Sequence, residues 1–297
     1  MTTRNLTPSA LSALERSNEE RISQIRAPKW IDYPLAREII GRMEELKEYP
    51  RIHRMPNMLI VGDTNNGKTS IVKRFLSLYP GENNPNHARQ KLPVLAIQAP
   101  AVPEERRLYS LLLESLGYPH TNEHPDTLRH RVVQTLPKVG VKLIIIDEIH
   151  NVNAGSPKKQ AVFMNVLRFL QNELPIPIVA VGILDAQYTI QADAQLENRF
   201  GRPYILARWR AGKDFLRLLA GFEACLPLQR ASNLTEPVMA GRLLALCGGV
   251  LGDLSALLQS AAIEAVKCGE ERISERILDK LGWQAPDPRR HTAQTAI

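Results

Sequence analysis

The sequence predicts an α/β nucleotide-binding core, in which helices flank a parallel sheet, followed by a small all-helical domain. Three observations predict it: a glycine-rich loop between an apolar run and a helical segment, further apolar runs that alternate with amphipathic segments, and a change to purely helical patterns after residue 210. The apolar runs show almost no polar alternation, which is typical of parallel strands buried on both faces. We therefore expect a doubly wound sheet with the glycine-rich loop at the carboxyl end of a strand.

The glycine-rich loop covers residues 62–69 and has the pattern G-x-x-x-x-G-K-T of a phosphate-binding loop. It follows the apolar run 58–61 and leads into a helical segment. The backbone N–H groups of such a loop and the following helix N-terminus surround a polyphosphate. We predict that Lys68 reaches the β- and γ-phosphates of ATP and that the Thr69 hydroxyl binds Mg²⁺. The other cofactor-binding candidates are Gly62, Asp63, Thr64, Asn65, Asn66, Gly67 and Ser70.

Asp147 and Glu148 follow a second apolar run, 141–146, and supply the other half of the predicted site. In P-loop enzymes the first acid holds Mg²⁺ and the next one polarises the attacking water. We therefore assign Asp147 to the metal, together with Thr69, and Glu148 to catalysis. The alternative is an acidic turn without function. The adjacent His150 is interpreted as a coupling or packing residue rather than a metal ligand.

The chain of 297 residues is longer than one typical domain requires. Its first 28 residues contain an amphipathic stretch from Ser9 to Arg26, which is either a helix that docks a partner or neighbouring subunit, or a simple packing helix. The expected divisions are this N-terminal segment (1–28), the α/β core (29–210), the helical domain (211–283) and a disordered tail (284–297).

The bulk composition favours a polyanionic partner inside the cell. The formal net charge is +7 and the pI about 9.4, and nucleic acid is the commonest partner of such a protein. The alternative is a basic protein with no such partner. The three cysteines are too far apart for a zinc site or a disulfide framework. Because no apolar run approaches the roughly 18 residues of a membrane span, we expect a soluble cytoplasmic protein with no membrane partner.

The P-loop, the acidic pair and the helical C-terminal part together resemble the AAA+ ATPases. Within that superfamily the likeness is to the TniB family, the regulatory ATPases of certain bacterial transposons, which are related to TnsC and more loosely to IstB and MuB. Three stretches carry it: residues 54–69, which read Arg-Met-Pro-Asn before the strand and Asp-Thr-Asn-Asn within the loop; Asp147 to Asn151; and Leu196 to Trp209. The resemblance covers roughly residues 28–282, and in it the helical domain is the AAA+ lid.

The resemblance implies a function in DNA transposition. ATP binding would drive assembly into rings or helical filaments on double-stranded DNA with little sequence preference. The assembly would mark a target and recruit or activate a transposase, together with a target-selection protein, in the bacterial cytoplasm. ATP hydrolysis would reset it.

The resemblance further assigns Arg199 to catalysis, as the arginine that reaches the γ-phosphate held by a neighbouring subunit, with Arg202 as the second candidate. The alternative for Arg199 is a local pairing with Glu197 or Asp193.

Two departures from the AAA+ pattern predict slow hydrolysis. The polar residue usually found just after the fourth strand is replaced by Ile183-Leu184, and the stretch 249–254 lacks the arginine that the lid usually offers. We expect bound ATP to act mainly as an assembly switch.

DNA contacts are assigned to Arg106 and Arg107, because in this clade the segment after the second strand lines the central channel. Lys142, Arg129 and Arg131 are weaker candidates, and each of these charges also fits an ordinary solvated surface. The segment Trp30 to Tyr33 either covers the adenine or packs internally.

Two other functions remain open at this point. A small-molecule kinase would need an acceptor pocket under its own lid and no arginine from a neighbour. An initiator-like or signalling AAA+ switch would use the same fold without taking part in transposition.

Overall fold

The computed structural model describes residues 5–81, 91–119 and 122–284. Contacts divide these residues into two compact units. The core unit comprises residues 38–64 and 68–206, and the helical unit comprises the described residues up to 37, residues 65–67 and those from 207 onward. By contacts, therefore, the N-terminal segment belongs with the C-terminal helices, whereas the sequence suggested a separate extension.

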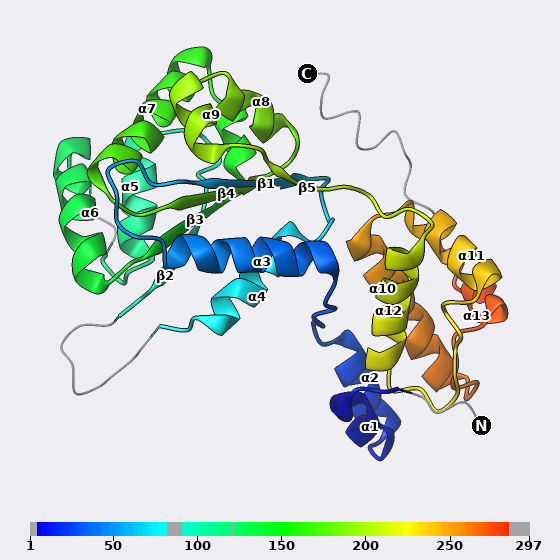
Figure 1. Cartoon of the computed structure of the whole chain (residues 1–297). Coiled ribbons are helices and arrows are strands. Elements are labelled where there is room, and N and C mark those ends of the chain that lie inside the picture. The colour runs from blue at the N-terminus through cyan, green and yellow to red at the C-terminus, as the bar shows by residue number, and fades with distance from the viewer. Residues whose placement is uncertain (1–4, 82–90, 120–121, 285–297) are drawn as a thin grey trace, which may run out of the picture. The chain divides into compact units, whose positions relative to one another are not determined.

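The core unit is built on one parallel sheet (Figure 1). Its strands lie in the order β2-β3-β4-β1-β5, with every pairing parallel. The strands are β1 (Met58–Gly62), β2 (Val94–Gln98), β3 (Leu143–Asp147), β4 (Ile178–Gly182) and β5 (Tyr204–Leu206). The predicted fold class is confirmed: a parallel sheet flanked by helices, with a helical C-terminal region.

Helices cover both faces of this sheet, which explains the unbroken apolar runs (Figure 1). Alternate strand residues such as Leu59, Val61, Ile144 and Ile146 join one large apolar cluster. That cluster includes side chains of α5 (Glu105–Glu114), α6 (Pro125–Val139), α7 (Pro157–Glu173), α8 (Asp185–Gln191) and α9 (Ala194–Phe200). The other face is covered by α3 (Pro34–Lys47) and α4 (Lys68–Leu78).

Two short elements of the core unit were not expected from the sequence. One is α8, and the other is a 3-10 helix, η1 (Ile149–Ala154), directly after the acidic pair. Both are too short to show a helical apolar period, and their formation depends on contacts with the rest of the unit. They turn out to matter for the site.

The helical unit contains α10 (Lys213–Cys225), α11 (Pro237–Cys247), α12 (Leu251–Lys267) and α13 (Glu275–Lys280), together with two N-terminal helices. The single helix expected from Ser9 to Arg26 is in fact α1 (Pro8–Leu14) and α2 (Asn18–Arg26). Ser17 separates them because its side chain caps α2 and forms a capping box with Glu20.

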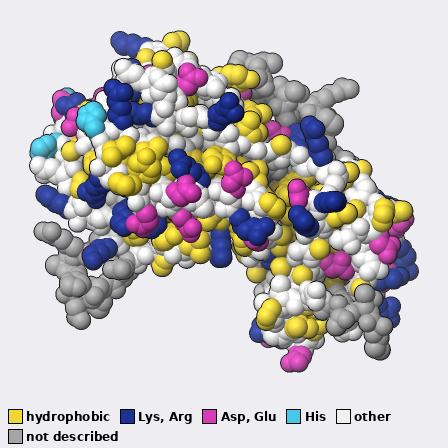
Figure 2. Space-filling view, in the orientation of Figure 1, with side chains coloured by type: hydrophobic (Ala, Val, Ile, Leu, Met, Phe, Trp, Pro, Cys, Tyr) yellow, Lys and Arg dark blue, Asp and Glu magenta, His cyan; other side chains and the backbone are white. Residues whose placement is uncertain are grey.

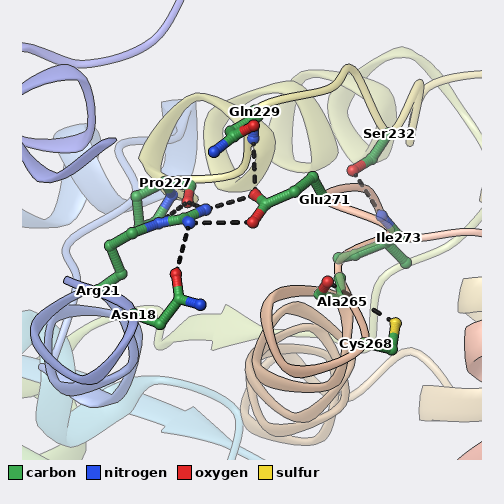
Figure 3. A network of polar contacts seen from close by, with 9 residues as sticks. All are labelled: Asn18, Arg21, Pro227, Gln229, Ser232, Ala265, Cys268, Glu271 and Ile273. Carbon is green, nitrogen blue, oxygen red and sulfur yellow. Dashed lines mark hydrogen bonds and ion pairs between the residues drawn. The ribbon is translucent and has the colours of Figure 1, made fainter. Parts of the chain in front are cut away.

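A buried ion pair joins α2 to the segment before α13 (Figure 3). The guanidinium of Arg21 forms two hydrogen bonds to the carboxylate of Glu271, one of them 2.9 Å long. It also donates to the Pro227 carbonyl at 2.8 Å and to Asn18 at 3.1 Å. Only 2% of the Arg21 side chain is exposed. Because α2 also packs along α12, the N-terminal helices form part of the helical unit.

Two expectations lie partly outside the described residues: residues 1–4 of the N-terminal segment and residues 285–297 of the predicted tail. Among the described residues, no single helix has the length and apolar composition to cross a membrane, and α11 and α12 meet these criteria only when counted together across a 116° bend.

Removing one partner of the buried ion pair should destabilise the protein. We expect Arg21→Ala to lower the free energy of unfolding by about 3–5 kcal/mol, because the Glu271 carboxylate would stay buried without its counter-ion. Chemical denaturation measures this, with Arg16→Ala on the same segment as the exposed control. Equal stability of the two variants would contradict the role given to the pair.

Candidate nucleotide-binding site

The P-loop begins where β1 ends, and its conformation requires glycine at two positions. A Cβ atom on Gly62 would lie 2.7 Å from the carbonyl oxygen of Leu206 on the paired strand β5, so any side chain there would force β1 and β5 apart. Gly67 has φ +90°, in the left-handed region that side chains disfavour. Both glycines therefore allow the tight backbone conformation that a phosphate-binding loop needs.

Lys68 lies inside the curl of the loop at the first position of α4, with 5% of its surface exposed. Its ammonium group donates to the carbonyls of Gly62 at 2.8 Å and Asp63 at 2.7 Å. Burial lowers the pKa of Lys68, and the carboxylates of Glu148, Asp147 and Asp63 partly offset this effect. The side chain is therefore held at the loop, within the field of the acidic pair.

Thr69 and Asp147 meet at the carboxyl edge of the sheet. The Thr69 hydroxyl donates to Asp147 Oδ2 at 2.9 Å, and Asp147 Oδ1 accepts from the backbone N–H of Glu148 at 2.8 Å. A hydroxyl and a carboxylate so placed fit a Mg²⁺ ion that takes its other ligands from phosphate and water. No group of three or more His, Cys, Asp and Glu side chains able to hold a metal occurs among the residues described.

Glu148 has a left-handed backbone conformation, with φ 55° and ψ 37°. Its carboxylate is 3.1 Å from Nε2 of His150, which belongs to η1. The other ring nitrogen, Nδ1, lies 3.4 Å from the backbone nitrogen of Ile183, just after β4. The structure thus brings together Lys68, Thr69, Asp147 and Glu148, and it adds His150.

Within the helical unit, the loop tip is bonded to the N-terminal end of α12. Asn65 donates to the Asp253 carboxylate at 2.8 Å and accepts from the Gly252 N–H at 2.9 Å. Asn66 accepts from the Leu251 N–H at 3.2 Å. The sequence singled out the two asparagines only as part of the loop. The residue type of Asn65 was the one feature of the sequence that could have predicted this loop conformation, because asparagine tolerates the left-handed region that it adopts here, φ 61°.

Arg199 lies at the opposite, amino edge of the sheet, because its carbonyl accepts from the N–H of Asn57 just before β1. With β1 five residues long, roughly 16 Å of strand separates the two edges. The guanidinium donates to the Gln171 carbonyl at 2.8 Å and to the Asn172 side chain at 2.5 Å, both at the C-terminal end of α7. Arg199 therefore bonds to α7, and not to the nearby acids suggested as an alternative.

Arg199 borders a cavity of about 670 Å³ at this edge. Its lining includes Arg54, His53, Asn172 and Glu173. Burial lowers the pKa of Arg199, and the positive charge of Arg54 lowers it further. Two arginines and one glutamate among the lining residues give this cavity an excess of positive charge, which favours an anion.

Each DNA-contact candidate already has a local partner. Arg106 donates to Asn122 at 2.7 Å and Arg107 to Glu114 at 2.9 Å, both on exposed surface. The weaker candidates are paired as well: Lys142 with Glu48, Arg129 with Asp126, and Arg131 with Glu123. On the face drawn in Figure 2, basic side chains are mixed with acidic and apolar ones.

In the segment 30–33, Tyr33 is buried and makes an edge-on contact with Trp209, with ring centroids 5.2 Å apart. Burial raises the pKa of Tyr33 to about 12. Its hydroxyl lies 3.9 Å from the position of a Cβ on Gly67, next to the loop tip.

Several solved structures have a fold similar to that of this chain. The ORC2 protein of Aeropyrum pernix matches with a TM-score of 0.62 at 15% identity, over 92% of this chain and 74% of that one. The ORC1 protein of the same organism, solved in complex with DNA, matches with a TM-score of 0.56 at 17% identity, over 87% and 68%. The core sheet and helical C-terminal region are thus those of the AAA+ fold.

In sequence, the chain is 25% identical to the chaperone protein ClpB of Meiothermus ruber over 168 residues, which are 54% of this chain and 18% of that protein. The family model described as "Bacterial TniB protein" matches residues 21–211, a range that includes the P-loop, the acidic pair and Arg199. The chain therefore belongs to the TniB family.

Proposed function

We propose that this protein binds ATP and Mg²⁺ at residues 62–70 and hydrolyses the ATP slowly. The hydrogen bond between Thr69 and Asp147, next to the ammonium group of Lys68, carries this proposal. Lys68 would neutralise the β- and γ-phosphates, Thr69 and Asp147 would hold the metal, and Glu148 would polarise the attacking water. The metal would neutralise charge that develops on the transferring phosphoryl group.

Arg199 acts on the nucleotide of a neighbouring copy in this proposal. The strand length between the two edges argues against a contact with its own P-loop, and its bonds to α7 hold the guanidinium in place. An acidic nucleotide edge and a basic edge on opposite sides favour head-to-tail assembly, which produces rings or helical filaments.

Hydrolysis is proposed to be slow because two polar contacts on the nucleotide are missing. Ile183 and Leu184 offer no polar side chain after β4. Where the lid would offer an arginine, Asp253 bonds to Asn65 of the loop tip. We expect steady-state turnover below about 1 s⁻¹ without DNA or a partner, so that bound ATP serves as an assembly switch.

Membership of the TniB family supports a role as a regulator of DNA transposition in the bacterial cytoplasm. The assembly would bind double-stranded DNA with little sequence preference, in keeping with the net charge of +7. It would recruit or activate a transposase and respond to a target-selection protein. Arg106 and Arg107 stay the first candidates for phosphate contacts, since an exposed arginine exchanges a local partner for phosphate at little cost.

Loss of the loop ammonium should weaken nucleotide binding. We expect Lys68→Ala to reduce the affinity for a fluorescent ATP analogue by roughly 10–100-fold, because a charge-assisted bond to phosphate is lost. Lys73→Ala, on the exposed side of α4, is the matched control. Equal binding by both variants would exclude the loop as the nucleotide site.

A mixture of two inactive variants should recover activity if Arg199 acts across an interface. Glu148→Gln and Arg199→Ala should each lose most ATP hydrolysis, by roughly 10³-fold for the arginine. An equal mixture should regain about a quarter of the wild-type rate, because one interface in four pairs an intact Glu148 with an intact Arg199.

If the mixture stayed inactive, Arg199 would not act on the nucleotide of a neighbouring subunit. Arg202→Ala, on the exposed segment before β5, is the control, and a comparable loss in that variant would shift the assignment to Arg202.

Electron microscopy with duplex DNA tests the assembly. We expect rings or filaments on DNA with a non-hydrolysable ATP analogue and none without it, and binding that falls steeply with salt and shows little base preference. Monomers in all conditions, with low salt sensitivity, would instead favour a kinase. Binding to one short sequence would favour an initiator-like switch.

A further inference from the structure

The end of β4 lacks a polar side chain, but its backbone is joined to the acidic pair through His150. The Nδ1 atom of His150 lies 3.4 Å from the nitrogen of Ile183, and its Nε2 atom lies 3.1 Å from the Glu148 carboxylate. One tautomer serves both contacts: Nδ1 accepts from the Ile183 N–H, and Nε2–H donates to Glu148. The imidazole thus connects the acidic pair at the end of β3 with the backbone at the end of β4.

The segment that carries His150 is fixed on both sides. On one side, the Asn151 amide donates to the carbonyl of Ala99, just after β2, at 3.1 Å. On the other, Thr189 of α8 donates to the Asn153 side chain at 2.6 Å. These bonds hold η1 between the end of β2 and α8, and they therefore fix the backbone that carries His150.

Gly182 lies in a tightly packed contact between the end of β4, η1 and α8. A Cβ atom on this residue would lie 3.0 Å from a methyl of Ile149, 3.1 Å from Cβ of Ala186 and 3.4 Å from the nitrogen of His150. The end of β4, η1 and α8 therefore touch at van der Waals distance. A close approach of this kind is what lets the Ile183 N–H reach the imidazole.

Glu148 needs such support because its backbone is in the left-handed region, φ 55°. A residue other than glycine adopts that conformation at a cost of about 1–2 kcal/mol and keeps it only where its surroundings fix it. Its carbonyl accepts from the Asn151 N–H at 2.9 Å, and its carboxylate is held by His150. About 34% of the Glu148 side chain is exposed, so without the imidazole the carboxylate would turn freely into solvent.

We infer that His150 is a positioning residue for ATP hydrolysis, which holds the Glu148 carboxylate in one orientation and ties it to the end of β4. It takes the place of the polar side chain that is absent at Ile183. The inference rests on the proposed function, because it gives the carboxylate the task of polarising water. Glu148 directly follows Asp147, whose carboxylate accepts a hydrogen bond from Thr69 of the loop at 2.9 Å.

Two variants separate hydrogen bonding from packing. His150→Phe keeps a ring but loses both hydrogen bonds, and we expect kcat to fall roughly 10–100-fold while the affinity for the ATP analogue stays within twofold. His150→Gln keeps a donor and an acceptor and should recover most of kcat. In a Glu148→Gln background, His150→Phe should cause no further loss, because the group it positions is already gone.

Three results would overturn the inference: an unchanged kcat for His150→Phe, a loss of ATP-analogue affinity equal to the loss in kcat, or the same additional loss of rate in the Glu148→Gln background. Thermal unfolding of each variant serves as the control for a purely structural effect.

A spectroscopic measurement tests the contact between His150 and Glu148 even if the protein hydrolyses no ATP. In ¹⁵N-histidine spectra of the full chain, His150, identified by the loss of its signals in His150→Phe, should show a protonated Nε2 and an unprotonated Nδ1. Glu148→Gln should shift the Nε2 signal. If the wild type hydrolyses no ATP but the shift is seen, the proposed function fails and the contact stands. Without the shift, the contact itself is wrong.

Discussion

The approach of β1 to β5 at Gly62 is the constraint on which the site depends. A Cβ atom on residue 62 would lie only 2.7 Å from the carbonyl oxygen of Leu206. Only glycine therefore allows β1 and β5 to come this close. Because β1 lies between β4 and β5, the loop follows an interior strand of the sheet and not an edge strand. Because all strands are parallel, the ends of β3 and β4 arrive at the same edge, and Asp147 reaches Thr69.

The same strand direction gives the core unit two chemically different edges. The carboxyl edge has the loop ammonium and the acidic pair, and the amino edge has Arg54 and Arg199 around an open cavity. Two like-charged guanidinium groups are unfavourable neighbours unless an anion joins them. The head-to-tail assembly proposed above uses this difference, because an acidic edge on one copy would attract a basic edge on the next.

The helical unit has its own organising interaction. The Arg21–Glu271 pair removes both charges from water and is sustained by additional bonds to Pro227 and Gln229 (Figure 3). It fixes the N-terminal helices to α12 and α13, so these helices contribute to the unit that also bonds the loop tip through Asn65 and Asn66. At the start of α12, the carboxylate of Asp253 accepts a hydrogen bond from the Asn65 side chain of the loop tip.

The sequence by itself determined the parallel α/β core, the helical C-terminal part, the P-loop and the acidic pair, because buried strands and phosphate-binding loops depend on local residue patterns. The choice of Arg199 as a candidate came only from a family resemblance and stays a prediction. The tertiary structure decided the rest. The contacts of His150 with Glu148 and Ile183, of Asn65 with Asp253 and of Arg21 with Glu271 join residues from separate elements. No periodicity along one segment encodes such pairs, since they arise only when strands and helices pack.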